Sequence, residues 1–206
     1  PSREDWEVIV SGLGISNSDH IVVYDNSDVL SSCRVWYSFL YFGHDSKLIS
    51  VLDGGFKKWV IEKRPTSKKI NSNKKSKYIA KENRSLVVNK DEVNKNIESK
   101  RFQLIDARGE KRFLGLQPEP REGLGSGHIK NSINLPFQLL INEDGTFKKI
   151  NELKQIFKEK KINIEKDKAF SCGSGITATI LGLANSIISG KNPVIYDGSW
   201  AEYGLD

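Results

Sequence analysis

Residues 168–188 read KAFSCGSGITATILGLANSII, and this stretch decides the fold. Apolar residues at its start predict a buried strand over 168–171, and the glycines in 172–175 predict a loop. The apolar residues that follow recur at helical spacing and predict a helix over 176–188. A further strand is predicted over 193–196. Because strands that alternate with helices form βαβ crossovers, we expect an α/β fold with a parallel sheet.

The front of the chain repeats this order of elements. A buried strand is predicted over 21–24, a polar loop over 26–31, and then a helix that carries Trp36 and Phe39 on its apolar face. A second strand is expected over 48–52. The segment DGGFKKW at 53–59 shares an Asp-Gly pair and two aromatic positions with DGSWAEY at 197–203. We therefore expect two related halves, each an open parallel sheet with helices on both faces.

The two copies differ in length. Only the second has a front portion, with a strand predicted over 86–88, a helix from Asn89 and a strand over 103–106. By comparison the first copy lacks roughly sixty residues, so we expect the natural protein to extend further at its N-terminus.

The same comparison predicts the domain boundaries. They are an N-terminal domain at 1–62 whose front part is missing, a linker at 63–85 and a C-terminal domain at 86–206. At the start of the chain, Ser2 and Asp5 predict a short helix that runs to about Leu13.

Composition excludes several classes of function. No run of about 18 apolar residues occurs, so we expect no membrane span. The net charge is +6, but the lysines of 63–81 stand among serines and asparagines rather than aromatic residues. That pattern favours a solvated linker over a nucleic-acid-binding arm. Cys33 and Cys172 are far apart and predict no disulfide framework, which favours a reducing compartment such as the cytoplasm.

The loop at 172–175 has the composition of an anion-binding cradle. Its glycines allow consecutive N–H groups to point inward, and the N-terminus of the following helix adds about half a positive charge. A cysteine held there is stabilised as a thiolate, which predicts a nucleophile at Cys172. The alternative is a buried structural cysteine that happens to precede a helix.

The sequence CGSGITA at 172–178 closely resembles the active-site loop of 3-mercaptopyruvate sulfurtransferases in the rhodanese superfamily. Other segments resemble the successive motifs of that family's catalytic domain: Asp106-Ala107-Arg108, Arg112-Phe113, Gln117-Pro118-Glu119-Pro120-Arg121, Gly127-His128-Ile129 and Ile133-Asn134-Leu135-Pro136. In the front half, Arg34-Val35-Trp36 and Val51-Leu52-Asp53-Gly54-Gly55 resemble its inactive domain. The resemblance implies tandem rhodanese-like domains of which only the second carries the cysteine. Asp25 stands at the corresponding strand end of the first.

The resemblance also implies roles for the loop residues. Cys172 is expected to carry sulfur as a persulfide. The loop from Gly173 through Gly175 and Ile176 to Thr177 is expected to steady that sulfur through backbone amides. Ser174 is expected to move a proton or to hold the substrate, and the alternative is a loop serine that faces solvent.

Arg112 and Arg121 are the substrate clamps that the resemblance implies. The chemistry agrees, because mercaptopyruvate carries a carboxylate and planar guanidinium groups bind carboxylates with two parallel hydrogen bonds. Each arginine has a surface ion pair as its alternative role.

Other conspicuous residues are given structural roles. His128 could act as a general base, but the resemblance places it in a structural Gly-His-Ile motif. Cys33 lacks a glycine cradle and is expected to be buried. Trp200 either lines the pocket or packs in the core. The histidines are scattered and the cysteines lack zinc-like spacing, so we expect no metal and no cofactor.

The expected reaction moves sulfur from 3-mercaptopyruvate, through the Cys172 persulfide, to thioredoxin, a small thiol or cyanide. Thiosulfate is the alternative donor, although the loops of rhodaneses that use it carry basic residues after the cysteine where Gly173 and Ser174 are neutral. A cysteine phosphatase would need an arginine at position 178, which is Ala178 here.

A non-turnover persulfide-binding module remains open. The family places an aspartate and a histidine from the front of the first domain near the catalytic serine, and this chain does not contain that region. A mitochondrial location is the alternative to the cytoplasm if the source is eukaryotic.

Overall fold

The computed structural model describes residues 1–69 and 73–205. The strands are β1 (Ile21–Val23), β2 (Ile49–Val51), β3 (Val87–Val88), β4 (Gln103–Asp106), β5 (Ile133–Asn134), β6 (Lys168–Ser171) and β7 (Ile195–Tyr196). The α-helices are α1 (Arg3–Gly12), α2 (Ser32–Tyr41), α3 (Gly55–Ile61), α4 (Lys90–Ser99), α5 (Glu110–Phe113), α6 (Ile150–Glu159), α7 (Ala178–Ser189) and α8 (Ser199–Tyr203). Three short 3-10 helices lie at Ser46–Leu48, Arg84–Leu86 and Phe137–Leu140.

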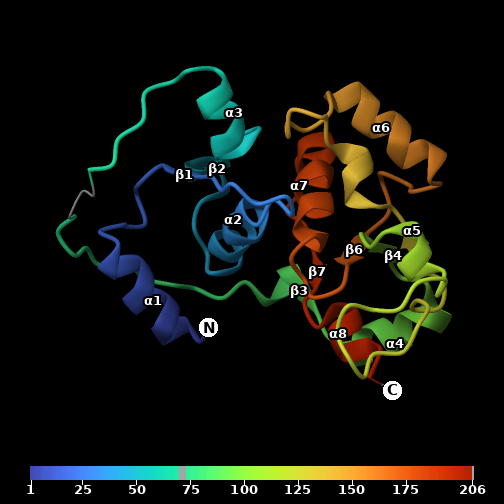
Figure 1. Cartoon of the computed structure of the whole chain (residues 1–206). Helices are drawn as coiled ribbons and strands as arrows, with labels where there is room; N and C mark the ends of the chain where they lie inside the picture. The colour runs from blue at the N-terminus through green and yellow to red at the C-terminus, as the bar shows by residue number, and fades with distance from the viewer. Residues whose placement is uncertain (70–72, 206) are drawn as a thin grey trace.

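The chain forms two parallel sheets that lie side by side (Figure 1). In the first half, β1 pairs with β2. In the second half five strands run in the order β3-β7-β6-β4-β5, and every pairing is parallel. The prediction of an α/β fold with a parallel sheet in each half is therefore confirmed.

Helices cover both faces of the second sheet because its strands alternate between two cores. Leu104 and Ala169 belong to a cluster with residues of α4 and α8. Their neighbours Ile105 and Phe170 point to the other face, where they join residues of α6 and α7. This two-sided burial fixes β4 and β6 at the centre of the sheet and brings their carboxyl ends together.

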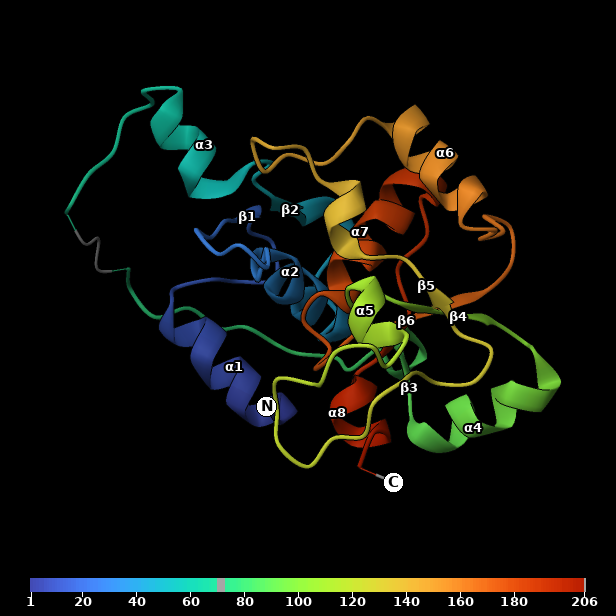
Figure 2. The same cartoon turned by 45° about the vertical axis from the view of Figure 1, so that its right-hand side comes forward.

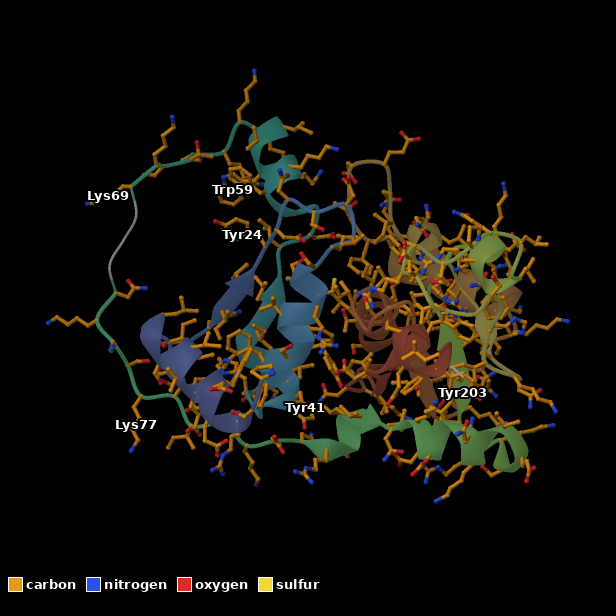
Figure 3. All side chains as sticks on the ribbon, turned by 60° about the horizontal axis from the view of Figure 1, so that its bottom comes forward. Tyr24, Tyr41, Trp59, Lys69, Lys77 and Tyr203 are labelled. Atoms are coloured by element: carbon orange, nitrogen blue, oxygen red, sulfur yellow. The ribbon has the colours of Figure 1, made fainter. Side chains whose placement is uncertain are left out.

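The first sheet is covered on one face only. α2 packs against β1 and β2, but Val22 and Tyr24 are 54% and 59% exposed. The prediction of a buried strand over 21–24 is therefore wrong for these two residues. Tyr24 stacks on Phe56 of α3, on the same side of the molecule as Trp59 (Figure 3). A two-stranded sheet offers one face to α2, and the side chains that alternate to the other face stay in water.

A single apolar core joins the two halves. α2 packs against α7, and one cluster of buried side chains runs from Trp36 and Leu40 in the first half to Leu181 in the second. In Figure 2, α2 lies beside α7, the helix that follows the Cys172 loop. This packing fixes the N-terminal end of α2 beside the catalytic half.

The linker is only partly solvated. Lys69 and Lys77 extend into solvent, as expected (Figure 3). Tyr78 and Ala80 instead are buried, and the backbone N–H of Ala80 donates to Glu7 Oε1 of α1 at 2.8 Å. The solvated-linker prediction is thus wrong at Tyr78 and Ala80, because these two side chains are buried beside α1. Its stretch at 70–72 lies outside the described residues.

The predicted strands over 168–171 and 103–106 coincide with β6 and β4. α7 begins at Ala178, two residues later than predicted at 176, because Ile176 and Thr177 form a tight turn that caps the helix. β5, α5 and α6 were not predicted. Within the described ranges, no helix has both the length and the apolar composition needed to cross a membrane.

Candidate active site

Cys172 lies at the carboxyl end of β6, where ligands of parallel α/β sheets bind. Its backbone is held by the turn into α8. The N–H of Cys172 donates to Ser199 Oγ at 3.1 Å, and that hydroxyl donates to the carbonyl of Tyr196 at 2.9 Å. The N–H of Trp200 donates to the carbonyl of Cys172 at 3.0 Å. The strand end is therefore fixed before the loop begins.

The loop after Cys172 turns back toward the sulfur. Gly175 has a φ of 76°, a conformation that favours glycine, and this bend lets the chain enter α7. The N–H of Ser174 donates to Cys172 Sγ at 3.4 Å. The N-terminus of α7, a helix of 12 residues, follows the loop and contributes partial positive charge. The local geometry suits a thiolate.

A pocket of about 280 Å³ opens at the sulfur. Its lining brings together most of the predicted site residues: Cys172, Gly173, Ser174, Ile176, Thr177, Arg112 and Arg121. Gly175, which was also predicted to bind substrate, is not part of this lining. Cys172 as a whole is 2% exposed, so its access to solvent is through the pocket.

Arg112 is held in place by a carboxylate that the sequence analysis gave no role. Arg112 Nη2 donates to Glu119 Oε2 at 2.5 Å, and its Nε donates to Oε1 at 3.2 Å. A Cβ on Gly173 would lie 3.1 Å from Arg112 Nη2, so the guanidinium rests against the loop backbone. Glycine at 173 permits this close approach.

Glu119 is in turn held by a buried arginine. The side chain of Arg108 is 1% exposed; its Nη1 donates to Glu119 Oε1 at 2.8 Å, and its Nη2 donates to Asp106 Oδ2 at 2.8 Å. Burial raises the pKa of Glu119, but hydrogen bonds and charge from Arg112 and Arg108 outweigh it, so the net pKa is lowered. Glu119 is therefore an anion at neutral pH.

The pocket carries a small positive charge. Arg112 and Arg121 are its two cations and Glu119 is its one anion, among the described lining residues. These three side chains together carry one net positive charge, before Cys172 is ionised. Such a pocket suits a small ligand with one carboxylate.

The remaining cysteine is inert. Cys33 is fully buried in the first half, and burial raises the pKa of its thiol to about 12. Both the burial and the raised pKa agree with the predicted structural role.

His128 and Trp200 take structural positions. His128 Nδ1–H donates to the carbonyl of Phe113 at 2.9 Å, and its ring stacks on that of Phe113. Trp200 lies outside the pocket lining, where its ring faces the Arg108 guanidinium at 4.4 Å and its Nε1–H donates to the carbonyl of Gly125. Core packing, the second of the two predicted roles, describes Trp200. Among residues 1–69 and 73–205, no three metal-ligating side chains form a group that could hold an ion.

The sequence analysis assigned no role to four residues of the pocket: Val29, Glu119, Pro120 and Leu124. Glu119 lay within a quoted motif, but only the folded chain shows which arginines it meets. Val29 comes from the first half, more than a hundred residues from Cys172 in the chain, and no local signal points to it.

Comparison with known proteins agrees with this geometry. The family described as "Rhodanese-like domain" matches residues 1–62 and 89–206. Thiosulfate sulfurtransferase from Rattus norvegicus is 41% identical over 206 residues, which cover 98% of this chain and 69% of the relative. The 3-mercaptopyruvate sulfurtransferase of Mus musculus is 38% identical, with 98% of this chain and 68% of the relative covered.

A solved structure has the same arrangement of both halves. The Tum1 protein from Saccharomyces cerevisiae superposes with a TM-score of 0.88 at 30% identity, over 100% of this chain and 72% of that chain. The two matched segments, the strand-end cysteine and the shared arrangement of the sheets all lead to one conclusion: this chain belongs to the rhodanese family.

Proposed function

We propose that this chain is a sulfurtransferase that takes sulfur from 3-mercaptopyruvate and carries it as a persulfide on Cys172. The observation that carries the proposal is the pocket in which the Cys172 sulfur meets Arg112 and Arg121. Its relatives named as 3-mercaptopyruvate and thiosulfate sulfurtransferases support the reaction class.

The two arginines are proposed to hold the donor. The carboxylate of mercaptopyruvate would pair with Arg112 and Arg121. This pairing would direct the thiol end of the donor toward Cys172. Glu119 keeps Arg112 on the loop backbone, so one binding group is oriented before the donor arrives. Preorganisation of this kind lowers the entropy cost of reaching the reactive geometry.

In the first step the Cys172 thiolate attacks the donor sulfur. A new S–S bond forms and the C–S bond of mercaptopyruvate breaks, with its electron pair left on carbon as the enolate of pyruvate. The proton of the donor thiol moves to that carbon, so pyruvate and an ionised persulfide result. We propose that the Ser174 hydroxyl, in the pocket beside Cys172, moves this proton. The amide of Ser174 and the N-terminus of α7 stabilise the anionic sulfur.

In the second step an acceptor thiolate or cyanide attacks the outer sulfur. The S–S bond breaks and Cys172 leaves as a thiolate, which restores the starting state. A small thiol or the exposed thiol of a protein such as thioredoxin is the proposed acceptor. The two free cysteines suit a reducing interior, the cytoplasm or a mitochondrion.

Thiosulfate is the second candidate donor, because the relatives that carry its name are as similar as those named for mercaptopyruvate. The charge of the pocket favours mercaptopyruvate. Thiosulfate is a dianion, whereas the two arginines of the lining already face the Glu119 carboxylate and the Cys172 thiolate, and no side chain at 173–176 adds a cation.

Donor profiling tests the proposal. Pyruvate release from 3-mercaptopyruvate is compared with thiocyanate formation from thiosulfate and cyanide, using the protein of residues 1–206. The expected kcat/KM is larger for mercaptopyruvate, and Cys172→Ser is expected to abolish both reactions. Cys33→Ala is the matched control and should retain both, because Cys33 lies outside the pocket. A preference for thiosulfate would refute the donor assignment.

Mass spectrometry separates turnover from simple sulfur storage. After incubation with mercaptopyruvate, the gain of one sulfur on Cys172 with stoichiometric pyruvate but no repeated cycles would favour a persulfide-binding module. Repeated pyruvate release in the presence of a thiol is the expected result.

A further inference from the structure

Arg34 belongs to the half that lacks the cysteine, yet it contacts the catalytic loop. It lies on the first turn of α2, and its Nη1 donates to the carbonyl of Gly175 at 3.2 Å. The same nitrogen forms an ion pair with the carboxylate of Asp197, the residue that follows β7. One guanidinium thus joins α2, the loop after Cys172 and the turn after β7.

The contact is close because Gly175 leaves no room for a side chain. A Cβ at this position would lie 2.9 Å from the backbone oxygen of Asp197 and 3.1 Å from Arg34 Nη1. The loop bend, the Asp197 turn and the arginine are therefore interlocked. A shift of any one of them changes the path of the loop toward α7.

The second half fixes the rest of the loop by itself. The N–H of Ala201 donates to the carbonyl of Gly173 at 2.8 Å, and the N–H of Thr179 donates to that of Ile176 at 3.1 Å. The carbonyl of Gly175 lies between these two anchors and accepts from Arg34. Its hydrogen bond thus comes from the other half of the molecule.

Arg34 is itself held firmly. Its guanidinium lies 5.6 Å from the centre of the Tyr37 ring, and the Tyr37 hydroxyl donates to the carbonyl of Leu86 at 2.7 Å. Because α2 also packs against α7, the base of the arginine moves with the second half. The side chain is therefore anchored by contacts to Gly175, Asp197 and Tyr37.

We propose that Arg34 is a positioning residue for sulfur transfer: it fixes the Gly175 peptide so that the loop amides remain directed at the Cys172 sulfur. This inference rests on the proposed function of Cys172. It also gives the first half a role in the chemistry, although that half has Asp25 where the second half has the nucleophile Cys172.

The test is the variant Arg34→Gln, which removes the positive charge and shortens the side chain. Arg112 and Arg121 are untouched, so KM for mercaptopyruvate should stay within about twofold while kcat falls about tenfold, as expected for a loop displaced from reactive geometry. Alkylation of Cys172 by iodoacetamide at neutral pH should slow by a similar factor. Arg34→Lys, which keeps the charge and can reach one acceptor, should recover part of both rates.

Arg64→Gln is the matched control. Arg64 lies in the linker directly after the first half, pairs with an exposed carboxylate on Glu62 and faces an aromatic ring, that of Trp59. It should leave kcat and the alkylation rate unchanged. Thermal unfolding of all three variants identifies any loss of folded protein, and rates are compared per folded molecule.

Two results would overturn the proposal. One is an unchanged kcat and alkylation rate in Arg34→Gln, and the other is a raised KM at constant kcat, which would make Arg34 a binding group. Failure of the proposed function is distinguishable, since it would show as absent sulfur transfer by the parent protein. The alkylation rates test Arg34 even in that case.

Discussion

The two halves place a pocket beyond the end of corresponding strands, β6 and β1, but surround the strand ends with opposite charge. After β6, Cys172 opens on a pocket of about 280 Å³ with two arginines and one glutamate. After β1, Asp25 lines a hollow of about 150 Å³ whose other acidic residues are Asp28, Glu143 and Asp144, against Lys57. The repeated backbone therefore specifies a place for a ligand, and the side chains decide whether an anion can enter it.

Asp25 also stabilises the first half, through hydrogen bonds at the start of α2. Its carboxylate accepts from the hydroxyl of Ser31 at 2.7 Å and from the N–H of Ser32 at 3.3 Å, at the start of α2. In the second half the strand-end residue Cys172 instead accepts at its sulfur from the nearby N–H of Ser174. The same kind of hydrogen bond stabilises a helix start in one copy and a reactive anion in the other.

Transplanting the nucleophile gives the largest expected effect. The double variant Asp25→Cys with Cys172→Ser should remain at least roughly a thousandfold below the parent in pyruvate release, as for other losses of a nucleophile. The acidic hollow would repel the carboxylate of the donor, and no arginine lines it among the described residues. Recovery of substantial activity would show that the strand end suffices and that pocket charge is secondary.

Cys33 is expected to be far less reactive than an ordinary cysteine. Because burial raises the pKa of Cys33 to about 12 from its ordinary value of 9.0, its thiolate fraction near neutral pH is lower by roughly a thousandfold. In Cys172→Ser, iodoacetamide should therefore leave Cys33 unmodified until the protein is unfolded. Peptide mass mapping before and after addition of denaturant measures this. Rapid labelling of the folded variant would contradict the burial that we describe.

Removing the single anion of the pocket should shift donor preference. Glu119→Gln raises the net charge by one, which favours a dianion over a monoanion by about 1.4 kcal/mol, or about tenfold. If Arg112 is held less firmly in this variant, kcat/KM falls for both donors, and the effect cancels in the ratio of the two values. We expect the ratio of kcat/KM for thiosulfate to that for mercaptopyruvate to rise about tenfold. Glu122→Gln, an exposed neighbour outside the lining, is the control; an equal ratio in both variants would mean that Glu119 does not set donor choice.

The smallest expected effect is at the strand end of the first half. Asp25→Ala removes the acceptor at the start of α2 and should lower the free energy of unfolding by about 1 kcal/mol. Chemical denaturation measures this loss. Sulfur transfer per folded molecule should stay the same, since Asp25 lies outside the Cys172 pocket. A drop in activity without a drop in stability would assign Asp25 a part in the chemistry.

Local sequence signals predicted much of the fold and part of the site. Apolar runs bounded by glycine and polar residues located β4 and β6 at their observed limits. α6 was not predicted, although Leu153 and Phe157 stand at helical spacing and are fully buried. The exposed face of β1 was also missed. Burial depends on which other elements cover a strand, and the residues of the strand do not identify those elements.

The sequence by itself determined the order of strands and helices, the duplication, and the loop in which glycines surround Cys172. These features follow from periodicity and backbone freedom, which act over a few residues. Only the tertiary structure decided which charges meet. Arg112 lies against Gly173, and Arg34 reaches Gly175, because parallel pairing of β4 with β6 and packing of α2 on α7 bring together segments that are distant in the chain. Electrostatic partners are set by distance in space, and no local pattern encodes that distance.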